Sequence, residues 1–206
     1  MQASTGRPNL LTKHAQWDFL LITLFTLVSI LNGQTTIFYI VYLFWWNELL
    51  RIIVDSFAYK QNPNAIRDNA EKNSLSGSVI PMIIYLVFII VFFGIIANWK
   101  NKEITIVNIN ILAFHNLFFN LNLLFILAER IILHKLKQPV QVYFGAFTPN
   151  MIVLHVSIIL GALLMFLVVR KYPDTFTPYN LWGSVLIISP FLLLKGIVGY
   201  KPPRRS

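Results

Sequence analysis

Two segments decide the fold of this chain: Asn108-Ile-Asn-Ile-Leu-Ala-Phe-His115-Asn116-Leu-Phe-Phe-Asn120-Leu-Asn122 and Asn150-Met-Ile-Val-Leu-His155-Val-Ser-Ile-Ile-Leu-Gly161. Each is apolar enough for lipid, yet each contains a histidine. Polar and ionisable side chains are costly inside a bilayer, so they usually face a protein interior or a water-filled cavity. The two segments therefore predict a polytopic membrane protein with a buried polar centre.

The composition supports this class. The 206 residues are 56% hydrophobic and only 12% charged, whereas soluble domains carry about 25% charged residues. The chain contains no cysteine, which excludes disulfides and thiolate metal sites. Its formal net charge is +9, but no basic run of five or more residues occurs. This distribution indicates contact with anionic lipid headgroups and argues against nucleic acid as a partner.

Six apolar segments predict an all-α fold, a bundle of six transmembrane helices. The expected spans are residues 16–31, 36–54, 78–97, 104–127, 149–169 and 179–198. They form one transmembrane domain, residues 16–198, between an N-terminal tail (residues 1–15) and a basic C-terminal tail (residues 199–206). The fourth helix is expected to continue through Arg130 and His134 into the aqueous phase.

Lysine and arginine are distributed unevenly between the two sides of these spans. Both tails and the loops after the second and fourth spans hold 11 of the 17 Lys and Arg residues, and the opposite loops hold four. An excess of Lys and Arg marks cytoplasmic loops. Both termini are therefore predicted to be cytoplasmic, with anionic lipid headgroups at that face. A homo-oligomer or a partner in a membrane complex remains an open alternative.

The second span carries a row of polar residues, Asn47, Arg51 and Asp55, spaced as i, i+4 and i+8 on a helix, with Glu48 within pairing reach of Arg51. A rise of about 1.5 Å per residue places Glu48 and His155 both roughly 10 Å below the cytoplasmic surface. The candidate substrate- or ion-binding residues are Glu48, Arg51, His115, Asn116, Asn120, His155 and Lys195.

The favoured hypothesis is proton-linked transport or channel activity, because imidazole and buried carboxylate groups suit proton exchange near neutral pH. Glu48 and His155 form the expected titrating pair. Their expected charge partners are Arg51 and Lys195. The face of the fourth span that carries His115, Asn116 and Asn120 is the expected route toward the midplane.

Two alternatives stand beside this hypothesis. In the first, the chain is a membrane-embedded enzyme or a haem or metal protein that uses His115 and His155, since imidazole binds such ions. No third ligand is evident, so no metal site and no cofactor are assigned. In the second, the chain is a structural or partner subunit whose polar groups only hold helices together. Ser157 and Gly161 form a small-residue pair suited to such close helix contact.

Four parts of the chain carry a resemblance: Ala113-Phe-His115-Asn-Leu-Phe-Phe119, Phe147-Thr-Pro-Asn150-Met-Ile-Val-Leu-His155-Val-Ser-Ile-Ile-Leu-Gly161, Trp45-Trp46-Asn47-Glu48 and Leu194-Lys195. Over residues 36–198 they resemble a domain-of-unknown-function family of bacterial polytopic inner-membrane proteins. The resemblance implies a multi-pass protein of the bacterial inner (cytoplasmic) membrane and matching positions for Glu48, His115, His155 and Lys195. It implies no activity.

This chain departs from the family pattern at four positions. Asn116 and Leu117 stand where the family usually has Tyr-Gly, and Leu123 stands where it has a second histidine. Asn150 stands where a basic residue is common. These departures argue against two-histidine chemistry on the fourth span.

Overall fold

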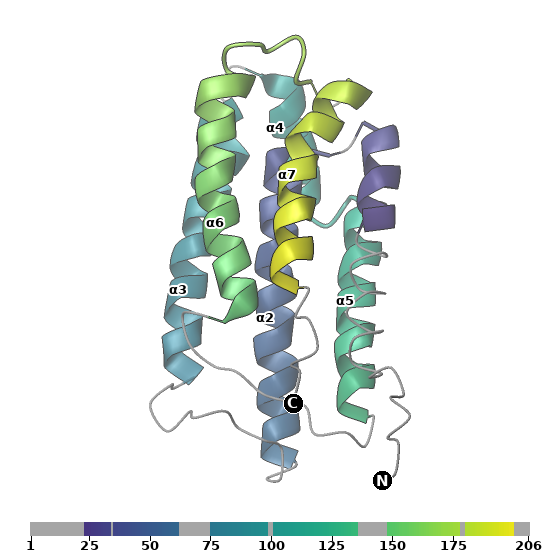
Figure 1. Cartoon of the computed structure of the whole chain (residues 1–206), viewed down its shortest axis with the longest axis vertical. Coiled ribbons are helices and arrows are strands. Elements are labelled where there is room, and N and C mark those ends of the chain that lie inside the picture. Colours follow the sequence, from purple (N-terminus) through teal and green to yellow (C-terminus); the bar gives the residue numbers. More distant parts are fainter. Residues whose placement is uncertain are drawn as a thin grey trace, which may run out of the picture.

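The computed structural model describes residues 23–33, 35–61, 75–98, 101–135, 148–177 and 180–199. Its six labelled α-helices are α2 (Ile37–Gln61), α3 (Leu75–Phe88), α4 (Lys102–Leu112), α5 (Leu117–Lys135), α6 (Pro149–Leu164) and α7 (Leu181–Gly199) (Figure 1). These described ranges contain no β-strand. Residues 23–31 are also helical. The remainder of the predicted first span and the predicted tails, apart from residue 199, lie outside the described residues.

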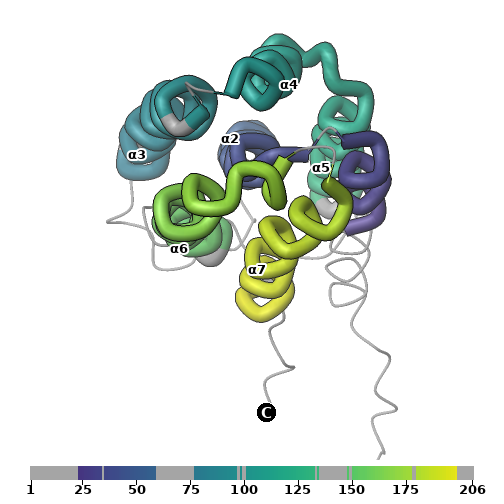
Figure 2. The backbone as a smooth tube through the Cα atoms, turned by 90° about the horizontal axis from the view of Figure 1, so that it is seen from above, coloured from purple at the N-terminus to yellow at the C-terminus, as the bar shows by residue number. Residues whose placement is uncertain are grey.

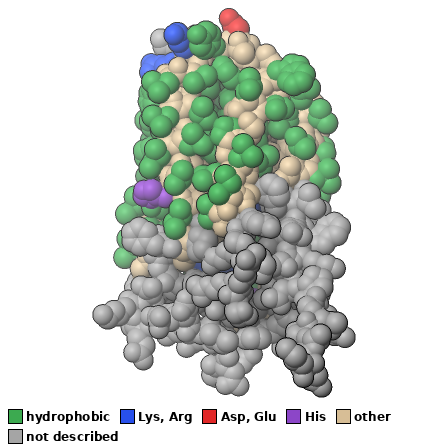
Figure 3. Space-filling model, in the orientation of Figure 1, with side chains coloured by type: hydrophobic (Ala, Val, Ile, Leu, Met, Phe, Trp, Pro, Cys, Tyr) green, Lys and Arg blue, Asp and Glu red, His purple; other side chains and the backbone are tan. Residues whose placement is uncertain are grey.

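Five helical segments are long and apolar enough to cross a membrane, and they fit an integral, multi-pass membrane protein: Ile37–Ala58, Gly77–Ile95, Lys102–Ile132, Asn150–Val169 and Leu181–Val198. They correspond to the second to sixth predicted spans. Large apolar side chains lie on the outside, including Ile84 (61% exposed), Leu167 (67%) and Ile197 (73%). Figure 3 shows such side chains covering the coloured, upper part of one face, with charged side chains gathered at its upper rim. A surface of this kind suits lipid, not water.

Helix α2 is the centre of the bundle, and the other helices surround it (Figure 2). In its span 67% of the residues are buried, against 28% to 33% in the other four. Every residue from Ile37 to Trp45 is at most 5% exposed, as expected for a helix that is apolar all round. The helix continues to Gln61, beyond the predicted end at residue 54. Hydropathy ends a span where charges begin, but the backbone hydrogen bonds of a helix do not stop there.

The predicted close contact at Ser157 and Gly161 is confirmed. Ser157 is fully buried. A Cβ atom at Gly161 would lie 3.0 Å from the ring of Phe93 and 3.1 Å from the side chain of Ile37. Phe93 belongs to η1 (Ile89–Ile95), a π-helical segment that follows α3. The absence of a side chain at position 161 therefore lets α6 approach both α2 and η1.

The predicted fourth span, residues 104–127, is not one continuous helix. Phe114 has a positive φ of 59°, which ends α4. Its N–H donates to the carbonyl of Ile111 at 3.1 Å, and the N–H of His115 donates to the carbonyl of Asn110 at 2.8 Å. These two bonds form a Schellman motif, which usually has glycine at the left-handed position. Phenylalanine in that conformation costs on the order of 1–3 kcal/mol.

The break between α4 and α5 leaves backbone groups without partners within a helix, and two asparagine side chains hydrogen-bond to such groups. The Oδ1 atom of Asn116 accepts from the N–H of Phe119 at 2.9 Å and so caps α5. The Nδ2 atom of Asn120 donates to the carbonyl of Phe114 at 2.7 Å. Hydrocarbon offers no replacement for these partners, so interrupted helices inside a membrane protein need protein groups or water at such points.

Replacing Asn116 by alanine should lower the thermal midpoint of the protein in detergent, because loss of a helix cap costs about 1 kcal/mol. Asn110→Ala is the matched control: it removes an exposed asparagine side chain of α4 from the same span. Equal midpoints for the two variants would contradict the capping role.

Candidate functional site

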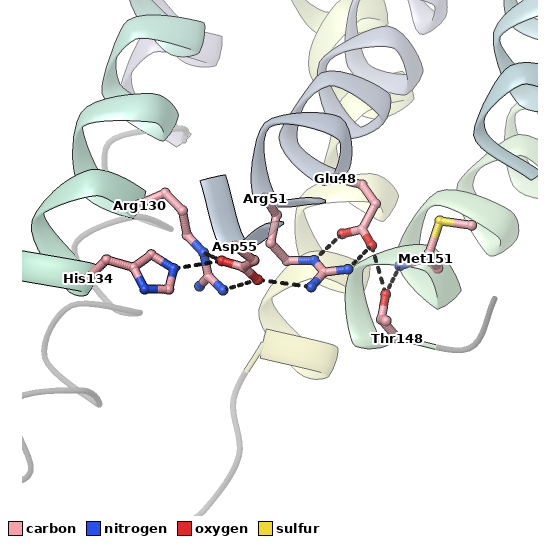
Figure 4. Close-up of polar contacts among 7 residues, drawn as sticks. All are labelled: Glu48, Arg51, Asp55, Arg130, His134, Thr148 and Met151. Carbon is pink, nitrogen blue, oxygen red and sulfur yellow. Dashed lines mark hydrogen bonds and ion pairs between the residues drawn. The ribbon is translucent and has the colours of Figure 1, made fainter. Parts of the chain in front are cut away.

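A cluster of five charged or ionisable side chains joins α2 to α5 (Figure 4). Glu48, Arg51 and Asp55 come from α2, and Arg130 and His134 come from α5. We refer to these five residues as the ionic cluster. Glu48 and Asp55 are 0% exposed and Arg51 is 7% exposed. The ionic cluster is therefore shielded from its surroundings, and each of its charges is stabilised by the other charges of the cluster.

Arg51 connects the two carboxylates of α2. Its Nε and Nη2 atoms donate to the two carboxylate oxygens of Glu48 at 2.8 and 2.6 Å. Its Nη1 atom donates to Asp55 Oδ2 at 3.2 Å. The spacings i, i+3 and i, i+4 place these side chains side by side on the helix. The predicted Glu48–Arg51 pair is confirmed, and it has the bidentate form that is strongest for an arginine and a carboxylate.

Asp55 joins α2 to α5. The Nε and Nη2 atoms of Arg130 donate to its two oxygens at 2.7 and 2.6 Å. The Nε2 atom of His134 lies 2.7 Å from Asp55 Oδ1. An ionised carboxylate only accepts hydrogen bonds, so His134 donates and its Nε2 atom carries the hydrogen. One buried carboxylate thereby fixes two side chains of the neighbouring helix.

Thr148 connects the ionic cluster to a third helix. It is the N-cap of α6, and its Oγ1 atom accepts from the N–H of Met151 at 3.2 Å. The same hydroxyl donates to Glu48 Oε1 at 2.9 Å. The Glu48 carboxylate therefore lies level with the first turn of α6. The ionic cluster and Thr148 together hold α2, α5 and α6 in one register.

The charges within the ionic cluster balance. It contains two carboxylates and two guanidinium groups, so its formal charge is zero when His134 is neutral. Removing an ion from water is expensive, and a buried pair is tolerated only when geometry and further hydrogen bonds are good. Each carboxylate oxygen here accepts at least one hydrogen bond. The ionic cluster can therefore keep its charges buried. Neutralising one of them would leave the remaining charges unbalanced.

His155 does not join Glu48 as predicted for a titrating pair. Its side chain is exposed, and its Nδ1 atom lies 2.5 Å from the hydroxyl of Tyr85 on α3. His155 is seven residues beyond Thr148, or about 10 Å farther along α6. The predicted equal depths assumed that α2 and α6 end level with each other. Because α2 continues past the start of α6, equal counts from the helix ends do not give equal depths.

His115 and His155 also lie apart from each other. His115 is exposed within the 113–116 connection between α4 and α5. Figure 2 places that connection and α6 on opposite sides of α2. In the part of the chain that the structure describes, no group of three or more His, Cys, Asp or Glu side chains could hold a metal ion. The geometry gives the two-histidine alternative no shared site.

The remaining predicted residues have separate positions. Asn116 and Asn120 serve the backbone at the interruption of the fourth span. Lys195 is 9% exposed, and its Nζ atom lies 5.7 Å from the centre of the Phe44 ring, a distance typical of a cation–π contact. Phe44 is one helical turn from Glu48 on α2. Lys195 therefore approaches the neighbourhood of the ionic cluster from α7 and does not extend to the surface.

The candidate residues predicted from the sequence did not include four members of this site: Asp55, Arg130, His134 and Thr148. Arg130 and His134 are four residues apart, which places them on one face of α5 and repeats the Arg51–Asp55 spacing. The predicted orientation also put Asp55 and that pair at the same side of the membrane. Thr148 before Pro149 is a recognisable helix start, but the sequence does not show that its hydroxyl reaches Glu48.

Replacing Asp55 by alanine should destabilise the folded protein by about 3–5 kcal/mol, because Arg51 and Arg130 lose a buried carboxylate. Asp174→Ala, in an exposed turn before α7, is the control and should leave stability unchanged. Unfolding of both variants by denaturing detergent gives the comparison. A stable Asp55→Ala protein would show that water already solvates these guanidinium groups.

The comparisons with known proteins found no match to the chain among protein-family models, curated proteins or solved structures.

Proposed function

We propose that the chain is a proton-linked transport protein of a bacterial inner membrane, closed at its cytoplasmic end by the ionic cluster. The main support for this proposal is a continuous series of hydrogen-bonded groups. It runs from His134 through Asp55, Arg51 and Glu48 to Thr148. Ionisable residues inside transmembrane bundles commonly mark ion pathways and proton relays. This series crosses three helices.

Protonation supplies a physical means of opening this closure. A proton on Glu48 or Asp55 removes a negative charge and leaves the two guanidinium groups in excess. In a low-dielectric interior such an imbalance is costly. It is relieved when α5 or α6 moves away from α2 and water enters. A local charge change would thereby shift an equilibrium between two helix arrangements.

The interruption between α4 and α5 supports movement of this kind. Discontinuous helices are common in secondary transporters, where one part of the bundle rocks against another. In this chain α5 carries Arg130 and His134, while the 113–116 connection separates it from α4. Helix α5 can therefore change its angle to α2 while α4 keeps its own contacts.

The distribution of Lys and Arg supports a cytoplasmic position for the ionic cluster. The ionic cluster lies toward the C-terminal end of α2, and its α5 members lie toward the C-terminal end of α5. The loops predicted from the sequence after these two spans belong to the side with the excess of Lys and Arg, which marks the cytoplasmic face. Under this orientation both termini are cytoplasmic.

Cysteine accessibility tests the closure directly, because the chain contains no cysteine of its own. Ser157→Cys places a thiol at a fully buried position of α6. A membrane-impermeant reagent on the cytoplasmic side should modify it faster at acid pH, and at any pH in the Glu48→Gln background. Phe57→Cys, at an exposed position of α2 on the same side as the ionic cluster, corrects for the effect of pH on thiol reactivity. Rates that follow this control at every pH would argue against the closure.

Proton flux tests the transport activity. Proteoliposomes with an internal pH dye, driven by a potassium gradient and valinomycin, should acidify faster with wild-type protein than without protein. Glu48→Gln should change this rate, because it removes the proton-binding carboxylate. His155→Ala should keep the wild-type rate, because His155 lies outside the ionic cluster. Indistinguishable rates for wild-type, Glu48→Gln and protein-free vesicles would count against transport.

A structural subunit is a second candidate, favoured by the complete pairing of the carboxylates in the ionic cluster. A paired cluster that joins three helices can serve as a fixed connection. Under this function Glu48→Gln lowers the thermal midpoint but changes neither thiol accessibility nor flux. The two experiments above therefore separate the candidates.

A further inference from the structure

A second polar region lies at the opposite end of α2 from the ionic cluster. A pocket is lined by residues from the start of α2, the end of η2 (Ile96–Asn98), the start of α4, η3 (Met165–Val169), the 172–177 turn and α7. A water-sized sphere can occupy about 30 Å³ of it, and the pocket is partly open to solvent. Its described polar lining residues are Thr35, Thr36, Asn98, Thr177 and Ser184. None of the described lining residues carries a charge.

The N-terminus of α2 lies at this pocket. The first N–H groups of a helix have no acceptor within the helix. Ile37 and Phe38, the first two residues of α2, line the pocket. The next N–H, that of Tyr39, donates to Thr36 Oγ1 at 3.1 Å. The positive end of the helix dipole therefore points at the pocket from a 25-residue helix that is largely buried.

Thr35 provides an independent indication of a ligand. The residue lines the pocket and is 3% exposed, and its Oγ1 atom has no hydrogen-bond partner among the residues that the structure describes. Thr36 beside it is satisfied, since its hydroxyl also donates to Asn108 Oδ1 at 2.7 Å. A buried hydroxyl without a partner is costly. A ligand that accepts a hydrogen bond would remove that cost.

We propose that this pocket binds a small monovalent anion, a halide or a carboxylate, through the first amides of α2 and the hydroxyl of Thr35. Helix N-termini bind anions because their N–H groups and dipole both favour negative charge. The described lining has no basic side chain, so nothing compensates the second charge of a divalent anion. The site is independent of the proposed transport function, since binding requires neither the ionic cluster nor its protonation.

Binding of radiolabelled chloride to the full chain in lipid nanodiscs tests this site. Wild-type protein should bind chloride saturably, with competition from acetate but not from sulfate at equal ionic strength. Chloride that replaces gluconate should also raise the thermal midpoint, because a ligand of the folded state stabilises it. Thr35→Val keeps the shape of the side chain and removes the hydroxyl. It should weaken chloride binding about tenfold or more, since it deletes a hydrogen bond to a charged group.

Thr26→Val is the matched control. Thr26 is fully buried and its Oγ1 atom also lacks a described partner, but it is not a lining residue of the pocket. Its chloride affinity should equal that of the wild type. Equal affinities for all three proteins would overturn the proposal. If Thr35→Val does not fold, the wild-type protein decides: absence of saturable chloride binding, or equal competition by sulfate, overturns it.

Discussion

Hydrocarbon offers no hydrogen-bond partner, and this constraint explains where the polar side chains of the described bundle lie. Three buried polar side chains on α2 or directly before it pair with other helices: Thr36 with Asn108 of α4, Tyr39 with Asn122 of α5, and Asp55 with Arg130 of α5. The apolar side chains between them only need to fill space. The central helix is therefore attached to its neighbours at separate levels, and each attachment fixes one neighbour's height and rotation.

The magnitudes of these contacts indicate what each one contributes. Replacing a buried ion pair by apolar residues of similar volume is often neutral or stabilising, so the ionic cluster is weak evidence for extra stability. Interhelical hydrogen bonds in membranes contribute only about 0.6–2 kcal/mol each. Apolar contacts between helices, however, depend on shape alone and carry no charge or hydrogen bond that identifies one partner. The Asp55–Arg130 and Glu48–Thr148 contacts therefore contribute mainly by selecting one register of α5 and α6 against α2.

Sequence reasoning predicted the features that depend on hydropathy and local spacing. The fifth predicted span, residues 149–169, matches the helical segment formed by α6 and η3, and the Glu48–Arg51 and Gly161 contacts follow from helical geometry. The interruption at residues 113–116 was missed, because Phe114 is as apolar as its neighbours and hydropathy does not report φ. The partners of Asp55 were missed because they come from another helix. Such contacts depend on the relative heights of helices, which the sequence of one segment does not contain.

The interruption between α4 and α5 also determines how the two halves of this span are held. The first half of this span, α4, is bound to η1, since Asn108 donates to the carbonyl of Phe93 at 3.2 Å. The second half, α5, is bound to the C-terminal part of α2 through the contact of Arg130 with Asp55. A continuous helix would carry both sets of contacts on one rigid element. Here the 113–116 connection divides them, so each half of the span is positioned by its own neighbour.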